Sequence, residues 1–337
     1  MKISSRKIIL FLITLVFLYL IFSNFDFKEL FLTIKGFDIK YLLLVAISVL
    51  FAFFCRACCF KQLISKTVDV SVWELFLLCI TGASLNIVLP ARAGDIFRAY
   101  YVGHKHNVDK VKIFGTVMLE RIFDGLVILS MLLLAIFLYN KNPLAQKLCV
   151  GASFIFFGSL ICAFLAIKFN KTDAICKYLQ EKSELLPEQL KKPVGSLLQF
   201  VNKVCNSFVA GFEILKYPKN LVKVAIAASG IWVFECLKYF IVVQGFNCDV
   251  DWSVVLFTIP FLALACMIPS TSIFVGPYQF AVIAAFAIYN VPKETALAVS
   301  LVEQAVVTLI TTIVASLFLI KNNISFKELK QDIEKTV

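Results

Sequence analysis

The fold of this chain is decided by the stretch Asn86-Ile-Val-Leu-Pro90-Ala-Arg92-Ala-Gly94-Asp95-Ile-Phe-Arg98. Its proline, glycine and charged side chains interrupt sequence that is otherwise apolar enough to lie in a bilayer. A helix is broken at that depth only where its backbone is buried in protein or lines a wet cavity. Charged groups in membrane segments are costly unless they are paired or solvated, so they mark candidate functional sites. The stretch therefore predicts a polar site inside the membrane.

The composition of the 337 residues is typical of a membrane protein. Hydrophobic residues make up 60% and charged residues 16%, whereas about a quarter of the residues are charged in ordinary globular chains. Apolar segments near the ~20-residue length of a membrane helix recur along the chain. They lie at residues 8–22, 41–60, 72–89, 114–139, 149–167, 221–243, 253–268, 273–291 and 296–320. We predict an all-α, polytopic membrane bundle that forms a single domain over residues 1–337.

The net charge of +11 indicates topology more than it indicates partners. Lys and Arg collect in cytoplasmic loops of membrane proteins, and no nucleic-acid-binding motif accompanies the charge, so we expect no nucleic-acid partner. We predict a multi-pass protein of the cytoplasmic membrane with both termini in the cytoplasm. The connection at 170–220 is interpreted as a cytoplasmic amphipathic segment, lying on lipid headgroups or packed beneath the bundle. Residues 321–337 are predicted to be a cytoplasmic tail.

A re-entrant hairpin explains the charges that follow the first break. If residues 72–89 crossed the membrane, the basic residues between 98 and 112 would lie outside, against the positive-inside rule. We therefore predict that the chain enters from the cytoplasm, turns at Pro90 and Gly94, and returns.

A similar break occurs in the second half of the chain. Pro269, Gly276 and Pro277 interrupt residues 253–291, which form either a second hairpin or two full spans. Paired breaks at corresponding positions point to an inverted-repeat transporter with a site near the membrane midplane.

The candidate site consists of charged and polar side chains near the two breaks. The predicted substrate-binding residues are Asn86, Arg92, Asp95, Arg98, Glu120, Arg121, Asp124, Tyr278, Gln279 and Glu303. Several of them are three or four apart and can pair on one helix face. The planar guanidinium suits phosphate, so we interpret Arg92 and Arg98 as ligands of a headgroup phosphate. The alternative interpretation is an ion-pair network that only joins the hairpin to its neighbour.

Other charged residues also lie inside apolar segments. Glu235 and Lys238 are three apart in one segment, and Arg56 lies near the end of another, where its side chain is expected to extend to the interface. Glu303 lies deeper and is interpreted as a site or coupling residue. The sequence shows no nucleophile–base arrangement, metal-ligand spacing or phosphate-binding loop, so we predict no catalytic residue, metal or cofactor.

At these residues the sequence resembles the lysylphosphatidylglycerol synthase transmembrane family, also called the flippase-like family. The family pattern of Asn, Pro-x-Arg-x-Gly-Glu and Arg, followed by Glu-Arg-x-x-Asp, is matched at Asn86, Pro90, Arg92, Gly94, Asp95, Arg98, Glu120, Arg121 and Asp124. A later proline-rich break is matched by Pro269, Gly276 and Gln279. Asp95 replaces the usual Glu, and Ser272-Ile273 stands where many members have Pro-Gly. The soluble aminoacyltransferase domain of the synthases is not found in these residues.

The resemblance implies a flippase that moves a phosphate-containing lipid between leaflets. Aminoacyl-phospholipids, glycolipids and polyprenyl-linked lipids are the candidate substrates, and membrane lipids are the expected partners. A lipid- or glycan-synthesis enzyme is a further candidate partner. Two alternatives stay open: a membrane-embedded transferase and an assembly factor in lipid or cell-surface glycan synthesis.

Overall fold

The computed structural model of the chain describes residues 16–22, 25–89, 92–138, 202–248, 250–266 and 276–324, with a few helical positions between 147 and 161. Every regular element in these ranges is helical, which confirms the predicted all-α class. Most of the predicted segments at 8–22 and 149–167 lies outside the described residues. So do Pro90, Pro269, the connection at 170–201 and the tail from 325 onward.

The described elements fall into long helices and short ones. The long helices are α3 (Lys40–Ile64), α6 (Lys110–Leu138), α10 (Pro218–Gly245) and α13 (Lys293–Lys321). The shorter ones are α2 (Phe27–Lys35), α4 (Val72–Val88), α5 (Ala93–Lys105), η1 (Glu213–Lys216), α11 (Trp252–Ala265) and α12 (Pro277–Ala287). Within the described ranges, α3, α10 and α13 are long and apolar enough to cross a membrane. This is a membrane protein.

Polar residues fix where several helices begin. The Ser71 hydroxyl accepts a hydrogen bond from the backbone N–H of Glu74 at 3.2 Å and caps α4. Asp109 accepts one from Val111 N–H at 2.8 Å at the start of α6. Burial opposes ionisation of this carboxyl, but hydrogen bonds from Ser207 and the backbone outweigh it and lower the pKa of Asp109. Pro218 and Pro277 occupy the first positions of α10 and α12, where the missing N–H has no consequence.

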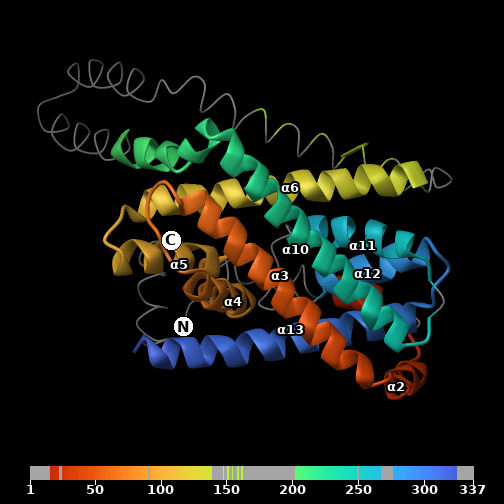
Figure 1. Cartoon of the computed structure of the whole chain (residues 1–337). Coiled ribbons are helices and arrows are strands. Elements are labelled where there is room, and N and C mark those ends of the chain that lie inside the picture. Colours follow the sequence, from red (N-terminus) through yellow and green to blue (C-terminus); the bar gives the residue numbers. More distant parts are fainter. Residues whose placement is uncertain are drawn as a thin grey trace, which may run out of the picture.

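The chain consists of two halves with the same order of elements. Each half has a long helix, two short helices and a second long helix: α3, α4, α5 and α6, then α10, α11, α12 and α13. Contacts also match, because α4 packs against α13 as α11 packs against α6, and α5 packs against α6 as α12 packs against α13. Figure 1 shows α3 and α10 crossing the molecule side by side, with α6 and α13 along opposite edges. The predicted inverted repeat is confirmed.

The two pairs of short helices enter from opposite ends of the molecule. At one end Ser65 accepts a hydrogen bond from Asn220 and Glu213 pairs with Lys112 at 3.1 Å. At the other end Asp38 N–H donates to the carbonyl of Gly245 at 2.9 Å. α4 and α5 join the long helices at the first end, and α11 and α12 join them at the second (Figure 1).

The helix lengths decide the arrangement of residues 253–291. A 17-residue helix rises about 26 Å and a 14-residue helix about 21 Å, both less than the ~30 Å hydrocarbon core. α4 has 17 residues, α11 has 14 and α12 has 11. Because α11 and α12 are this short and pack against each other, as α4 and α5 do, their arrangement is that of a hairpin and not of two spans.

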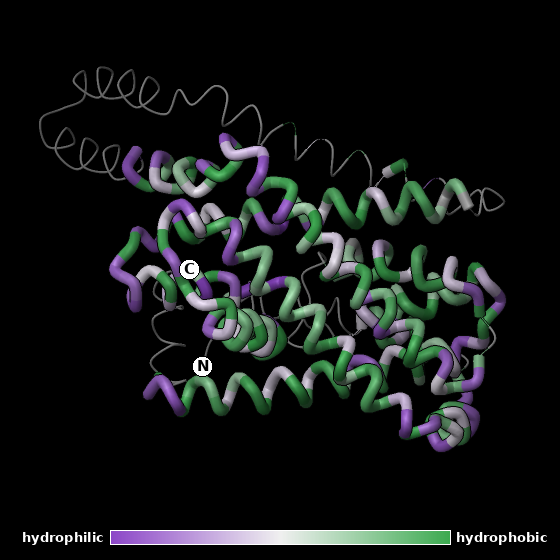
Figure 2. Tube along the Cα trace, in the orientation of Figure 1, coloured by the Kyte–Doolittle hydropathy of each residue, from purple (hydrophilic) through white to green (hydrophobic). Residues whose placement is uncertain are grey.

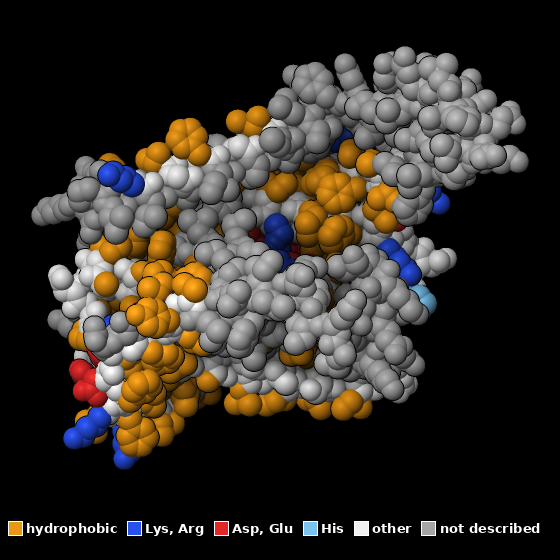
Figure 3. All heavy atoms as spheres, turned by 180° about the vertical axis from the view of Figure 1, so that it is seen from behind, with side chains coloured by type: hydrophobic (Ala, Val, Ile, Leu, Met, Phe, Trp, Pro, Cys, Tyr) orange, Lys and Arg blue, Asp and Glu red, His pale blue; other side chains and the backbone are white. Residues whose placement is uncertain are grey.

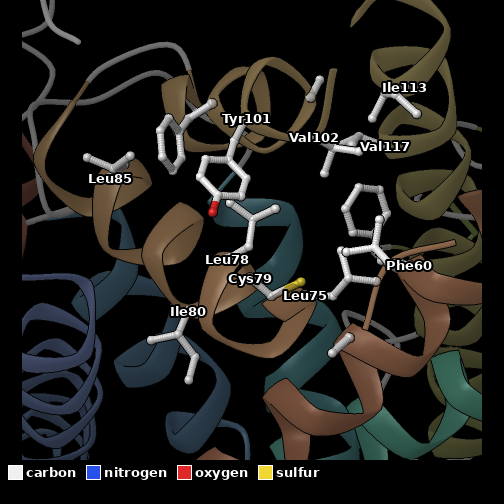
Figure 4. Packing of buried hydrophobic residues seen from close by; sticks show 14 of the residues in the cluster. Phe60, Leu75, Leu78, Cys79, Ile80, Leu85, Tyr101, Val102, Ile113 and Val117 are labelled. Carbon is white, nitrogen blue, oxygen red and sulfur yellow. The ribbon is translucent and has the colours of Figure 1, made fainter. Parts of the chain in front are cut away.

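The core of the first hairpin is dry and apolar. Leu75, Leu78 and Cys79 of α4 are buried against Tyr101 and Val102 of α5. Figure 4 shows this packing, with Val102 directed toward Ile113 and Val117 of α6. In Figure 2 the long helices are mostly hydrophobic, and hydrophilic residues collect toward the two ends of the bundle.

The described part of the amphipathic connection packs beneath the bundle. Residues 202–210 are helical, and the rings of Phe208 and Phe114 are tilted by 50°, with centroids 6.3 Å apart. A Cβ on Gly211 would lie 2.5 Å from the carbonyl oxygen of Lys112, so only glycine fits there. The described residues of this segment therefore pack against α6.

Candidate functional site

The first hairpin closes through two glycines. A Cβ on Gly94 would overlap the carbonyl oxygen of Gly82, so α4 and α5 approach each other at their backbones. The Asn86 side chain accepts a hydrogen bond from Gly94 N–H at 2.8 Å and thereby binds an otherwise unpaired donor at the start of α5. Gly94, predicted as a turn residue, instead lies inside α5, because close packing rather than a special backbone angle requires a glycine there.

Arg92 takes the turn conformation at the tip of this hairpin. Its φ of 53° and ψ of 42° lie in the left-handed region, directly before the first residue of α5. Asparagine occupies the other left-handed non-glycine positions of the described chain, at Asn107, Asn247, Asn290 and Asn323. Asparagine tolerates this region better than arginine does. A strained, exposed arginine is an outlier that points to a functional constraint.

Glu120 of α6 is the centre of a buried charge cluster. It is fully buried and accepts from three guanidinium groups. Arg98 lies at 2.6 Å, Arg56 at 2.7 Å and Arg121 at 3.1 Å from its carboxylate oxygens. The guanidinium of Arg98 also covers the ring of Phe60 at 4.3 Å. Hydrogen bonds of this charge-assisted kind are what allows a carboxylate to remain in a dry interior.

Two aspartates complete this group. Asp124 pairs with Arg56 and Arg121, each at 3.0 Å, and accepts from the indole N–H of Trp232 at 3.1 Å. Asp95 pairs with Arg121 at 3.4 Å and Arg98 at 3.7 Å. We call Arg56, Asp95, Arg98, Glu120, Arg121 and Asp124 the arginine–carboxylate cluster. Its three guanidinium groups and three carboxylates balance in charge.

A second buried group lies between α10, α12 and α13. Lys238 pairs with Glu303 at 2.5 Å and Glu235 at 2.6 Å. The Tyr278 hydroxyl donates to the other carboxylate oxygen of Glu303 and shares a hydrogen bond of 2.5 Å with the Tyr239 hydroxyl. We call these five residues the lysine–glutamate cluster.

Amides hold the second hairpin to α13. Gly276, with φ of 100°, precedes the first residue of α12 as Arg92 precedes that of α5. Its N–H donates to the Gln279 side chain at 2.8 Å, and Gln279 donates to Gln304 at 2.7 Å. Gly276 thus acts as the predicted break, while Pro277 begins α12.

The two clusters occupy equivalent positions in the two halves. Glu120 lies ten residues after the first residue of α6, and Glu303 lies ten after that of α13. Each receives a cation from the first long helix of its half, which is Arg56 or Lys238. Ten residues of helix rise about 15 Å. Because the halves run in opposite directions, the two glutamates lie at about equal distances from opposite ends of the bundle.

The contacts between each hairpin and the long helix that follows it also repeat in the two halves. The third residue of α5, Asp95, pairs with Arg121, and the third residue of α12, Gln279, pairs with Gln304. The first half therefore uses charges where the second uses neutral amides.

Part of the first cluster remains open to a ligand. The side chains of Arg121 and Arg56 are 29% and 15% exposed, whereas that of Arg98 is 2% exposed. Figure 3 shows basic and acidic atoms at the floor of a hollow on the face opposite to that in Figure 1.

The structure brings most predicted site residues into these two groups. Arg92 alone among the predicted charged residues forms no ion pair with another described residue. Arg56 was not predicted to join the site, and its expected extension to the interface is wrong, because it turns inward to Glu120 and Asp124. Glu235, Lys238, Tyr239 and Trp232 also join these groups, although they are not among the predicted site residues. The signal available for Lys238 was its charge inside an apolar segment.

The chain was also compared with known proteins. Residues 7–315 match the family described as the lysylphosphatidylglycerol synthase TM region. The chain belongs to this family.

Two archaeal relatives are similar over most of their length. The UPF0104 membrane protein MJ1595 of Methanocaldococcus jannaschii is 24% identical over 273 residues, which cover 76% of this chain and 77% of the relative. The UPF0104 membrane protein MJ1078 of the same organism is 23% identical over 215 residues, covering 64% of this chain and 84% of the relative. The chain is thus a membrane protein of a lipid-related family.

Proposed function

We propose that this protein moves a phosphate-bearing lipid between the two leaflets and holds its headgroup at Arg92. One observation carries the proposal: Arg92 is exposed, strained and without an ion pair among the described residues, directly beside a cluster whose charges balance. Its positive charge is therefore available to an anion. A guanidinium binds a phosphate with two parallel hydrogen bonds.

The neighbouring arginines have different roles in this proposal. Arg121 keeps a partly exposed side chain and can contact the same headgroup. Arg98, which the sequence also assigns to the phosphate, is buried with both terminal nitrogens directed at Glu120. We assign it the positioning of Glu120 and of the hairpin.

The opposed hairpins support movement across the membrane. Each contains two short helices, and inverted-repeat transporters bind substrate near the midplane, between interrupted helices of this kind. A polar tip at this depth shields a headgroup while the acyl chains remain in lipid.

The test uses the full chain reconstituted in liposomes that contain fluorescent phosphatidylglycerol, with leaflet exchange read by quencher accessibility. A hydrogen bond to a charged group contributes about 1.5–3 kcal/mol, so we expect Arg92→Ala to slow exchange by about tenfold or more. Arg92→Lys should retain part of the rate, and Lys40→Ala, at an exposed helix end, should not alter it.

Unchanged exchange in Arg92→Ala would contradict the assignment. A covalently changed lipid, found by mass spectrometry of the extracted lipids, would identify a transferase instead.

A further inference from the structure

The short helix α2 is amphipathic, and the bundle leaves its apolar face uncovered. Because successive residues of a helix are about 100° apart, Phe27, Phe31 and Ile34 lie on one face. These residues are 62%, 59% and 37% exposed, and no residue of α2 is buried. Glu29 lies on the opposite face, about 200° around the helix from Phe27. The apolar face of α2 therefore has no partner within the bundle.

The bundle nevertheless anchors α2 on both sides. After the helix, a Cβ on Gly245 would lie 2.4 Å from the ring of Phe37, so this ring packs against bare backbone at the end of α10. Before the helix, the Lys293 ammonium lies 5.5 Å from the centroid of the Phe25 ring. α2 also packs against α13. Its apolar face is thus a defined part of the molecular surface.

α2 lies across one end of the bundle. Figure 1 shows it nearly end-on, whereas α13 runs across the view. Because α13 is long enough to cross a membrane, α2 lies roughly parallel to the membrane plane. The contact between Phe37 and Gly245 places it level with the end of α10, and α3 begins directly after it at Lys40. This is the depth at which the long helices leave the bilayer and at which lipid headgroups lie.

The basic residues of α2 suit this depth. Lys28 and Lys35 are about two turns apart and lie on the same flank of the apolar face. The Lys35 ammonium lies 4.8 Å from the centroid of the Phe31 ring, so its stem runs along apolar surface. Lysines placed in this way keep their charge at the interface, as in helices that lie on a membrane.

The uncovered apolar surface continues from α2 into a long helix. Ile39 and Leu43, at the start of α3, are 74% and 68% exposed. Figure 3 shows hydrophobic side chains over the lower left corner of the molecule, where α2 lies in that view, and along the adjoining edge. Apolar surface on a membrane-spanning helix faces lipid, and the face of α2 extends that surface.

We infer that α2 is an interfacial helix that binds the lipid surface at its end of the bundle. Phe27, Phe31 and Ile34 insert just below the headgroups, and Lys28 and Lys35 lie at the phosphates. This contact fixes the depth of the bundle in the bilayer. It is independent of Arg92 and of the lipid that the protein moves.

The test introduces a photoreactive residue into the otherwise unchanged full-length chain. Phe31→benzoylphenylalanine keeps an aromatic ring at the apolar face, and Glu29→benzoylphenylalanine is the matched control on the opposite face. Both proteins are irradiated in vesicles of phosphatidylethanolamine and phosphatidylglycerol, and mass spectrometry measures the yield of lipid adducts. We expect a several-fold greater yield from position 31 than from position 29.

The other outcomes would overturn the inference. Equal yields from the two positions would show that the apolar face is not directed at lipid. A covalent dimer from Phe31→benzoylphenylalanine, in place of a lipid adduct, would identify a second copy of the chain as the occupant. Phe27→benzoylphenylalanine, one turn earlier on the same face, decides the question if the first variant does not accumulate. Adding Arg92→Ala should leave the adducts unchanged, which separates this contact from the proposed function.

Discussion

Glu120 shows how one side chain can organise a membrane protein. It accepts from Arg56, Arg98 and Arg121, which come from three different helices, and it has no contact with solvent. Each guanidinium is also held by an aspartate. Since positive and negative charges are equal in number, removal of one partner leaves an uncompensated charge in a dry environment.

This balance leads to a prediction for Arg56. Arg56→Met should lower the free energy of unfolding by about 3–5 kcal/mol, because Glu120 and Asp124 lose a shared cation. Adding Asp124→Asn restores the balance and keeps an oxygen for the Trp232 indole, so the double variant should recover much of the loss. Unfolding in detergent with increasing denaturant measures the free energy of unfolding of the single and the double variant. Additive losses would show that the two residues act independently.

Pairs close in sequence could be predicted, and distant ones could not. Helical spacing correctly indicates that Arg121 pairs with Asp124 and Glu235 with Lys238, because residues three apart share a helix face. The contact between Arg56 and Glu120 spans 64 residues and depends on how α3 packs against α6. No spacing rule contains that information.

At the scale of the element, the first hairpin depends on backbone contact between α4 and α5. A proline and a glycine predict a break, but they do not show which residue adopts the turn conformation. Arg92 does so, although its side chain makes this unfavourable by about 1–2 kcal/mol. Gly94 is needed for a different reason, the approach to Gly82.

We predict that Gly94→Ala destabilises the hairpin. The added methyl group would overlap the carbonyl of Gly82, and such overpacking costs about 1–3 kcal/mol or more. Gly151→Ala is the matched control, because a Cβ there meets no neighbouring atom within 4 Å and alanine favours helix by about 1 kcal/mol. Thermal unfolding of the purified proteins compares the two. Equal stability of both variants would mean that α4 and α5 are farther apart than described.

At the scale of the whole molecule, the sequence predicted the hairpin motif and its duplication. Charge counting could not distinguish a hairpin from two full spans at residues 253–291, because both arrangements place the ends of this segment on the same side of the membrane. The helix lengths distinguish the two arrangements, since α11 and α12 are each too short to cross the membrane. The long helices present exposed apolar side chains, such as Leu43, Ile226 and Leu309, in accord with a surrounding of lipid.

The two ends of the bundle predict a labelling pattern. In a cysteine-free background, Lys110→Cys and Lys219→Cys should react with a membrane-impermeant reagent from one side, which the basic residues indicate to be the cytoplasm. Lys40→Cys and Asp251→Cys should react only from the other side. Reaction of Lys110→Cys and Lys40→Cys from the same side would exclude the arrangement.

The separation of the two clusters has a consequence for biogenesis. Every ion pair of the arginine–carboxylate cluster joins residues between 56 and 124, and every one of the lysine–glutamate cluster joins residues between 235 and 303. Chains are synthesised and inserted from the N-terminus. The first half can therefore neutralise its own charges in the bilayer before the ribosome has made the second.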